Sequence, residues 1–280
     1  MSLHSFLLCI TRNTSLPLSL RKKIGNKLHG PTESTFDVQL FGQTYRGQAG
    51  VHLDEKVYRY NLHEAPTIRL LRSIAQWQQS QGQESVFWDI GSNSGLHLIT
   101  VAPLVSQAVG FEPWDKIRSH ALSNISRNNQ KQVQVMPFGL SNQDALLNFN
   151  PPDGRNYGVG YFTQNDSSTK LQVKCGDAVA NDLKAVPSMM KIDVEGHEKS
   201  VLEGLKNTIK ANRPAIVFEY AGSNITDFKT VNQRESLFGQ GYTYWGIKRS
   251  REYPKLVPFK PGDRYENVLA WPETHLPAFR

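Results

Sequence analysis

Cysteine is scarce in this sequence, and long apolar runs are absent. Only Cys9 and Cys175 occur among 280 residues, which excludes a disulfide framework and favours a reducing compartment such as the cytoplasm. No apolar run approaches the roughly 20 residues that span a bilayer, so we expect a soluble protein. The short run 6–10 follows no basic residue and precedes no convincing small-residue cleavage site, so we expect no signal peptide.

Acidic residues are absent from the first 30 positions. Five of the net +7 charges lie there, on Arg12, Arg21, Lys22, Lys23 and Lys27, and the rest of the chain carries only +2. Charge confined to a tail argues against a basic groove for nucleic acid. We expect residues 1–34 to form a basic tail. Its stretch LPLSLRKKIGNKLHG could be a short amphipathic helix that docks on a membrane or a partner, or it could be a solvated, partly frayed end.

The remaining chain passes from a hairpin to alternating strands and helices. In residues 35–82, apolar–polar alternation around Gly42 predicts a β-hairpin, and apolar residues at helical spacing then predict a helix. Over residues 83–272, apolar strands alternate with helices, interrupted by a β-rich excursion after residue 144. This alternation is typical of an α/β fold with a mostly parallel sheet covered by helices on both faces. Residues 273–280 are expected to be a C-terminal tail.

A glycine-containing turn ends the first of these strands, in the segment VFWDIGSNSG. A dinucleotide fingerprint needs glycines at its first, third and sixth positions, but the third is Asn93 and the sixth is Leu96. No Gly-Lys-Ser/Thr follows, which excludes a P-loop. Gly91 and Gly95 allow close approach to the backbone. Asp89 offers a carboxylate that would repel a phosphate but suits a cationic amine.

A second acid, Glu112, ends the next strand in AVGFEP. A carboxylate at this place accepts hydrogen bonds from ribose hydroxyls in dinucleotide-binding folds. A ligand with an adenosine and a cationic amine but no phosphate describes S-adenosylmethionine, so we predict this cofactor. The alternative is an ordinary strand–turn–helix whose glycines serve packing.

Three titratable residues alternate after a later strand, in MMKIDVEGHE. Asp193, Glu195 and His197 share one face while the chain stays extended. Methyl transfer to a neutral hydroxyl needs a base to take its proton. His197 has a suitable intrinsic pKa, and Asp193 or Glu195 could orient it or act instead. Glu195 and His197 could alternatively cap the following helix. The three side chains could also bind a divalent metal, but their spacing is no recognised metal pattern and we do not favour it.

The order of these segments resembles a known family. Between about residues 57 and 271, the chain is similar to FkbM-type S-adenosylmethionine-dependent methyltransferases in the segments FWDIGSNSG, GFEP, FGLSNQDALLNF, KIDVEGHEKSVLEGL and PAIVFEY. The resemblance implies a Rossmann-like class I fold with a seven-stranded, mostly parallel sheet whose last strand is antiparallel. It implies methyl transfer, usually to a hydroxyl oxygen, with a saccharide or secondary-metabolite acceptor. Residues 1–35 and 256–264 match no element of the family.

The resemblance also implies contacts for individual residues. The methionine part of the cofactor is expected at Asp89, Gly91, Asn93 and Gly95, the ribose at Glu112, and the adenine at Ser141. Glu64 could contact cofactor or substrate. Asn156, Tyr157 and Gly158 could line the acceptor pocket or form a hairpin turn. The isolated histidines His52, His63 and His97 are expected to be structural.

Two other functions remain open. The positive charge would suit a nucleic-acid methyltransferase, although no Asn-Pro-Pro-Tyr-type motif follows the fourth strand and no added RNA-binding domain is present. A non-catalytic S-adenosylmethionine-binding protein would bind the cofactor without turnover.

Overall fold

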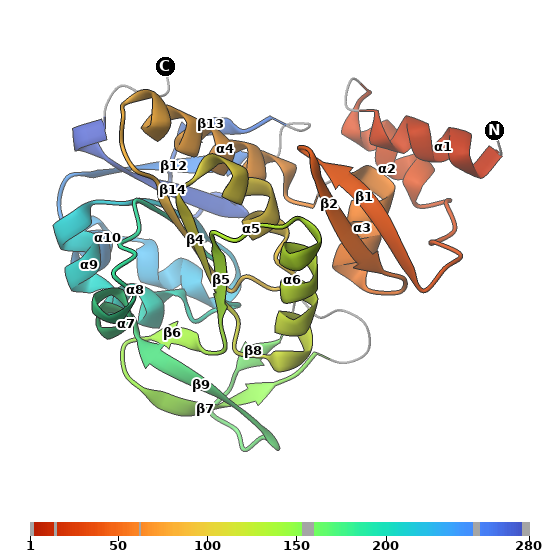
Figure 1. Cartoon of the computed structure of the whole chain (residues 1–280). Coiled ribbons are helices and arrows are strands. Elements are labelled where there is room, and N and C mark those ends of the chain that lie inside the picture. The colour runs from red at the N-terminus through yellow and green to blue at the C-terminus, as the bar shows by residue number, and fades with distance from the viewer. Residues whose placement is uncertain (1–2, 14–15, 62, 153–159, 249–252, 276–280) are drawn as a thin grey trace.

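An eight-stranded sheet forms the centre of the chain. The computed structural model describes residues 3–13, 16–61, 63–152, 160–248 and 253–275 (Figure 1), so Asn156, Tyr157 and Gly158 lie outside the described residues. The strands follow the order β13 (Lys255–Pro258), β12 (Tyr242–Lys248), β14 (Asn267–Pro272), β11 (Ala215–Glu219), β10 (Met189–Ile192), β3 (Val86–Ile90), β4 (Gln107–Phe111) and β5 (Val133–Met136).

The strand directions are those of a mostly parallel sheet. Neighbouring strands from β11 to β5 pair in parallel, and β14 inserts antiparallel between β11 and β12. The prediction of an antiparallel last strand is confirmed, whereas the expected count of seven strands is one too low. The additional strand, β13, forms the edge of the sheet and pairs antiparallel with β12. It lies mainly in the segment 256–264 that resembles no family element.

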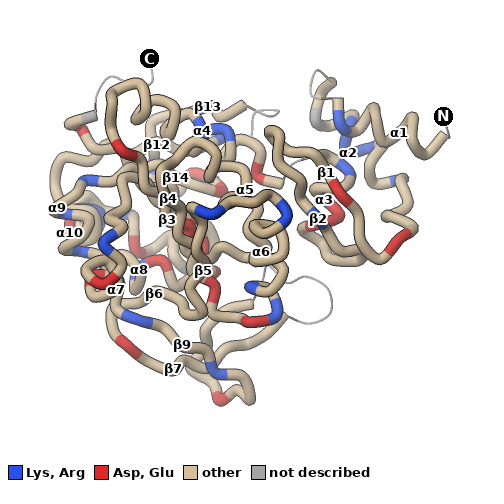
Figure 2. Tube along the Cα trace, viewed as in Figure 1, with Lys and Arg blue, Asp and Glu red and all other residues tan. Residues whose placement is uncertain are grey.

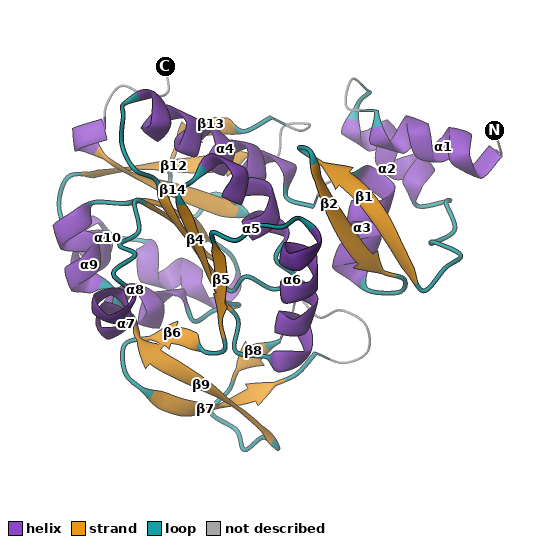
Figure 3. Cartoon of the chain, in the orientation of Figure 1, coloured by secondary structure: helices purple, strands orange, loops and turns teal. Residues whose placement is uncertain are grey.

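Helices cover both faces of this sheet (Figure 3). Successive strand residues point to opposite faces, so Phe87 and Met189 enter one apolar core while Trp88 and Met190 enter the other. The first core packs against α4 (Ala65–Ser80), α5 (Leu96–Val101) and α6 (Asp115–Arg127). The second packs against α7 (Gly176–Leu183), α8 (Glu198–Gly204), α9 (Lys206–Asn212) and α10 (Val231–Phe238).

The β-rich excursion forms a separate small sheet beside the carboxyl ends of the main strands (Figure 1). Its order is β6 (Gly139–Ser141), β9 (Thr169–Cys175), β7 (Ala145–Asn150) and β8 (Tyr161–Phe162). Short 3-10 helices complete the fold at η1 (Ala102–Leu104), η3 (Gly222–Phe228) and η4 (Glu273–His275).

The N-terminal segment is packed in its described part, which differs from the frayed end considered above. Its elements are α1 (Leu3–Arg12), α2 (Leu18–Gly25), β1 (Thr35–Leu40), β2 (Gln43–Gln48) and α3 (His52–Tyr60). Arg21 is buried and donates from Nε to the Thr11 carbonyl at 2.6 Å. Arg12 donates to the Tyr58 carbonyl of α3. The remaining basic residues of α2 and the following turn, Lys22, Lys23 and Lys27, are exposed. Figure 2 shows where Lys and Arg lie along the chain. No helix in the described part of the chain is long and apolar enough to cross a membrane.

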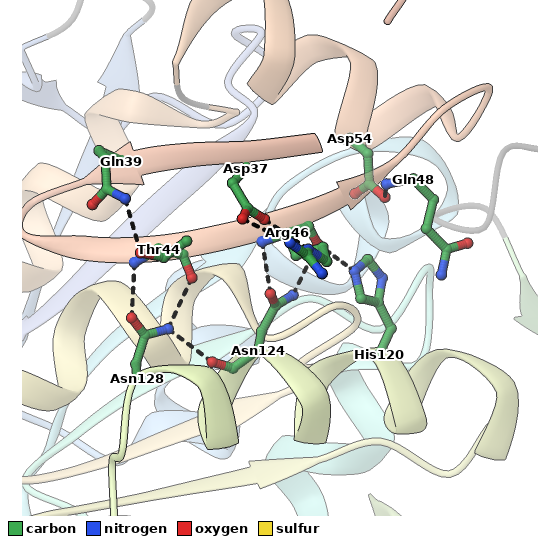
Figure 4. Close-up of polar contacts among 9 residues, drawn as sticks. All are labelled: Asp37, Gln39, Thr44, Arg46, Gln48, Asp54, His120, Asn124 and Asn128. Carbon is green, nitrogen blue, oxygen red and sulfur yellow. Dashed lines mark hydrogen bonds and ion pairs between the residues drawn. The ribbon is translucent and has the colours of Figure 1, made fainter. Parts of the chain in front are cut away.

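Asparagine side chains of α6 attach the hairpin to the rest of the fold (Figure 4). Asn128 accepts from the Thr44 N–H at 2.8 Å and donates to the Thr44 carbonyl at 2.9 Å. One turn earlier, Asn124 accepts from the Arg46 N–H at 2.8 Å. These amides pair with β2 as a neighbouring strand would. The hairpin, and α3 with it, is thereby held against α6.

Candidate active site

A cavity of about 370 Å³ lies where β3, β4, β10 and β11 end. This volume falls within the roughly 300–1,000 Å³ of small-molecule sites. The carboxyl ends of parallel strands are the ligand-binding edge of such a sheet. Of the predicted site residues, Gly91, Asn93, Glu112, Asp193 and Glu195 line the cavity.

The glycines of the turn serve the fold as well as the cavity. Gly91 has φ +83°, and a Cβ atom there would lie 1.9 Å from the carbonyl oxygen of Asp193. Gly95 has φ +78° and lies against Ala121 of α6. Close approach of the chain to itself therefore requires both glycines, which is the packing role considered above. Asn93 also has a positive φ, +47°.

Glu112 is held in a fixed orientation at one end of the cavity. Its two carboxylate oxygens accept from the N–H groups of Asn93 and Trp114, each at 3.0 Å. Burial raises the pKa of Glu112 to about 7, against the lowering effect of these two hydrogen bonds. The carboxyl group is therefore positioned before any ligand binds.

Asp89 lies beneath the turn and does not line the cavity. It is fully buried, and neither carboxylate oxygen has a hydrogen-bond partner among the described residues. Ser92, which lines the cavity, has a buried hydroxyl oxygen that also lacks a hydrogen-bond partner among the described residues. Burial raises the pKa of Asp89. Unpaired buried polar groups are costly, so the Ser92 hydroxyl, which lines the cavity, is suited to a polar ligand. The charge of Lys191 acts on Asp89 and opposes the effect of its burial.

Lys191 is a residue of the site that the sequence analysis missed. It is 1% exposed, lines the cavity, and places Nζ 2.8 Å from Oδ2 of Asp193. Burial alone would lower the pKa of this ammonium, but Asp193, Glu64 and Asp89 raise it above its ordinary value. Lys191 therefore stays charged and compensates these buried acids.

Glu64 also lines the cavity, and it begins α4 in a left-handed conformation with φ +53°. Its Oε2 lies 3.2 Å from Nε2 of His97. Burial opposes ionisation of Glu64, but His97 and Lys191 outweigh it and lower the pKa of Glu64 well below its ordinary value. His97 lines the cavity, as do His52 and His63. The expectation that these three histidines are structural stays a prediction.

Three glutamates line the cavity together, from the ends of different strands. They are Glu195 after β10, Glu219 at the end of β11, and Glu266 before β14. Glu195 is exposed on one side, but partial desolvation by the surrounding protein, with Asp193 and Glu198, raises its pKa to about 7. Burial, with Asp193 and the neighbouring glutamates, raises the pKa of Glu219 to about 9. At neutral pH Glu219 is therefore protonated and Glu195 is partly protonated.

His197 does not share the face of Asp193 and Glu195. The expected alternation needs an extended chain, but Glu195 has φ +53° and Gly196 has φ +96°, so the chain turns there. Nε2 of His197 lies 2.9 Å from the hydroxyl oxygen of Ser141. Neither His197 nor Ser141 lines the cavity. The His197 side chain does not cap α8 either.

Aromatic side chains form another wall of the cavity. Trp114 follows Glu112, and its ring centroid lies 5.7 Å from that of Phe149 in the small sheet. Phe162 packs on Phe149 at 6.0 Å and on His197 at 5.1 Å. A flat ring bound beside Glu112 would thus meet apolar aromatic surface. Within the described ranges, no three His, Cys, Asp or Glu side chains gather as a metal-binding group.

The sheet order, the cavity at its carboxyl edge and the two strand-end acids define a class I methyltransferase fold. The chain matches the family model "Methyltransferase FkbM domain" over residues 89–244, and it belongs to this family. It is 27% identical over 167 residues to the hexuronic acid methyltransferase AglP of Haloferax volcanii, a match that covers 59% of this chain and 65% of that protein's length.

Comparison with solved structures finds a similar fold at a TM-score of 0.50 and a weaker similarity to another methyltransferase. The S-adenosylmethionine-dependent methyltransferase from Agrobacterium tumefaciens has a TM-score of 0.50 and 8% identity, with 87% of this chain and 72% of that chain covered. The methyltransferase FkbM from Methylobacillus flagellatus KT has a TM-score of 0.46 and 18% identity, with 67% and 43% covered.

Proposed function

We propose that this chain is an S-adenosylmethionine-dependent methyltransferase that methylates a hydroxyl of a saccharide acceptor. The observation that carries the proposal is that one cavity joins a positioned acid, Glu112, to the carboxyl groups of Asp193 and Glu195. Membership of the FkbM family supports it. The named activity of the Haloferax relative supports an acceptor of the hexuronic acid type.

The residues at the Glu112 end suit the cofactor. Glu112 would accept hydrogen bonds from the ribose hydroxyls, and Trp114 would pack against the adenine. Asn93 and the unpaired hydroxyl of Ser92 would hold the methionine part, and the Asp89 carboxyl beneath the turn would act on its cationic amine through its charge rather than by contact. When bound, S-adenosylmethionine supplies the methyl group on a sulfonium that attracts nucleophiles.

The chain's own contribution to the chemistry is orientation and removal of a proton. Asp193 has one oxygen engaged by Lys191, which makes it a positioning acceptor for the substrate hydroxyl rather than the base. Glu195 reaches solvent on the cavity wall. A general base is most effective when its pKa lies near the working pH. We therefore assign the base to Glu195 rather than to His197.

A titration of S-adenosylhomocysteine and S-adenosylmethionine tests the cofactor. Glu112→Gln should weaken binding about 10–100-fold, because it removes hydrogen bonds to a charged acceptor. Glu84→Gln, at an exposed position, is the matched control and should bind normally. Absence of binding in the unaltered protein would refute the proposal. Transfer of a labelled methyl group to a panel of saccharides then tests the reaction and separates an enzyme from a non-catalytic binding protein.

The nucleic-acid alternative has less support. Six acidic residues line the cavity, but only two lysines and no arginine of the described chain do so. Phosphate contacts dominate nucleic-acid affinity, and such a lining opposes them.

We also propose that α2 and its flanking turn contact an anionic membrane. Lys22, Lys23 and Lys27 are exposed there, beside Leu20 and with Phe6 of α1 also exposed. Basic and apolar groups together favour an interfacial position. Replacing the three lysines by Gln should reduce sedimentation with anionic vesicles in a salt-dependent way. Lys206→Gln/Lys210→Gln on α9 is the control, and equal loss in both variants would oppose the proposal.

A further inference from the structure

A buried phenol joins the N-terminal hairpin to the glycine turn of the cavity. Tyr45 of β2 has no exposed surface, and its hydroxyl lies 2.8 Å from the hydroxyl oxygen of Ser94. Ser94 stands between Asn93 and Gly95 and lines the cavity. The family match begins at residue 89, so Tyr45 contacts this turn from outside the matched domain.

The hydroxyl of Tyr45 is itself held by a carboxyl group of α3. Asp54 is 1% exposed, and its Oδ1 accepts from the Tyr45 hydroxyl. Its Oδ2 accepts from the Gln48 N–H at 2.7 Å (Figure 4). Burial, with the charge of Asp54, raises the pKa of Tyr45 far above its ordinary value, so the phenol keeps its proton. A phenol donates one hydrogen bond and accepts others, and Tyr45 therefore binds Asp54 and Ser94 together.

The contacts of Ser94 continue to the acid at the other end of the turn. The Ser94 N–H donates to the Asn93 side chain at 2.7 Å, and the Asn93 N–H donates to Glu112 at 3.0 Å. The Ser94 carbonyl accepts from Asn124 of α6 at 3.2 Å. Asn93 has φ +47°, which is uncommon for residues with a side chain. A continuous series of hydrogen bonds thus runs from Tyr45 to Glu112 and fixes the turn in this conformation.

The turn depends on the Tyr45 hydroxyl more than the core does. Without it, an Asp54 oxygen and the Ser94 hydroxyl would lose a buried partner, which is costly. The ring itself would stay in the apolar core that contains Val57 and Leu96. A ligand held by a loosened turn binds more weakly, because it must order the turn when it binds.

We propose that Tyr45 is a positioning residue for the cofactor and that, together with Asp54, it holds Ser94 so that the turn is shaped before S-adenosylmethionine binds. This inference rests on the proposed function, which places the methionine part of the cofactor at this turn. It extends the cofactor site to the hairpin and to α3, a helix from which further residues line the cavity, namely His52, Leu53 and Lys56.

Calorimetric titration of the full chain with S-adenosylhomocysteine tests the inference. Tyr45→Phe should weaken binding about 10-fold, as the loss of one buried hydrogen bond predicts. Ser94→Ala removes the same contact from the side of the turn and should also weaken binding. In the Ser94→Ala background, Tyr45→Phe should weaken binding by no more than about 2-fold, because the contact through which it acts is already gone.

Tyr242→Phe is the matched control. Tyr242 is also a buried tyrosine, and its hydroxyl donates to the Pro214 carbonyl at 2.9 Å, but it does not line the cavity. Urea unfolding should show a loss of stability in Tyr242→Phe and in Tyr45→Phe. Affinity for S-adenosylhomocysteine should fall only in Tyr45→Phe, which separates positioning of the turn from support of the fold.

The outcomes separate this inference from the proposed function. Unchanged affinity in Tyr45→Phe overturns the inference, and so does an equal loss of affinity in Tyr242→Phe. A full 10-fold effect of Tyr45→Phe in the Ser94→Ala background, as expected for independent sites, overturns it as well. If Tyr45→Phe does not fold, unchanged affinity in Ser94→Ala overturns it. Failure of the unaltered protein to bind S-adenosylhomocysteine overturns the proposed function itself.

Discussion

Replacing Lys191 by Met should destabilise the fold far more than loss of an ordinary lysine. The side chain is 1% exposed and its ammonium pairs with Asp193 at 2.8 Å, near Glu64 and Asp89. Removing one partner of a buried pair leaves uncompensated charge and costs about 3–5 kcal/mol. Total stabilities are about 5–15 kcal/mol, so urea unfolding measures the loss directly.

The pH dependence of this loss identifies its cause. Without Lys191, the buried carboxyls hold protons more tightly in the folded state than in the unfolded state, so stability of Lys191→Met falls as pH rises. The difference from the unaltered protein should be largest at pH 8 and smaller at pH 5. Adding Asp193→Asn should recover part of the loss at pH 8, because it neutralises one of the unpaired acids.

A matched control is Lys199→Met. The Lys199 ammonium lies 3.5 Å from Asp227, and the two side chains are 50% and 30% exposed. Such a surface pair contributes about 0–1 kcal/mol. Equal losses in Lys191→Met and Lys199→Met, or a loss independent of pH, would refute the reasoning.

Three further predictions follow from the site. Gly91→Ala and Gly42→Ala both place alanine at a positive φ, but only at Gly91 would the Cβ meet another atom within 4 Å. Unfolding should show about 1–2 kcal/mol lost in Gly42→Ala and more in Gly91→Ala, with cofactor binding lost only in the latter; equal costs would contradict the contact with Asp193. Because the pKa of Glu195 is raised to about 7, turnover should fall as pH drops below about 7. Glu195→Gln should lower kcat about 10²–10⁴-fold, and a rate retained in that variant would exclude Glu195 as the base. His197→Ala should cost about 1 kcal/mol of stability through its lost hydrogen bond to Ser141 with kcat nearly unchanged, and a hundredfold fall in kcat would restore His197 as the base.

The strands and the acids at their ends could be predicted because their signals are local. An apolar run of three or four residues followed by a carboxylate marks a buried strand that ends at the ligand edge, as at Asp89 and Glu112. The same rule applied to PAIVFEY would have predicted Glu219. Lys191 could also have been predicted from the sequence. Alternation in MMKIDV places it on the same face as Asp193, and a lysine within an apolar strand needs a buried partner.

The remaining site residues depend on information that a sequence pattern does not hold. His197 was assigned on the assumption of an extended chain, and the turn at Glu195 and Gly196 breaks that assumption. Lys56 reaches the cavity only because the hairpin docks on α6, whose contact residues lie 78 and 84 positions after those of the hairpin. A periodic pattern within one segment does not predict a contact between segments that are distant in the sequence. The extra strand β13 likewise lies mainly in a segment without family likeness.

Asn124 and Asn128 of α6, which pair with β2, also affect the tendency of the protein to aggregate at high concentration. A two-stranded hairpin exposes unpaired N–H and C=O groups on each outer edge, and such edges recruit strands from other molecules and promote aggregation. On β2, the outward groups of Thr44 are occupied by Asn128, and the Arg46 N–H is occupied by Asn124. The Arg46 carbonyl lies 2.6 Å from Nε2 of His120, one turn earlier on the same helix. A foreign strand therefore finds these positions already filled, so this helix protects the chain from intermolecular β-pairing along that edge.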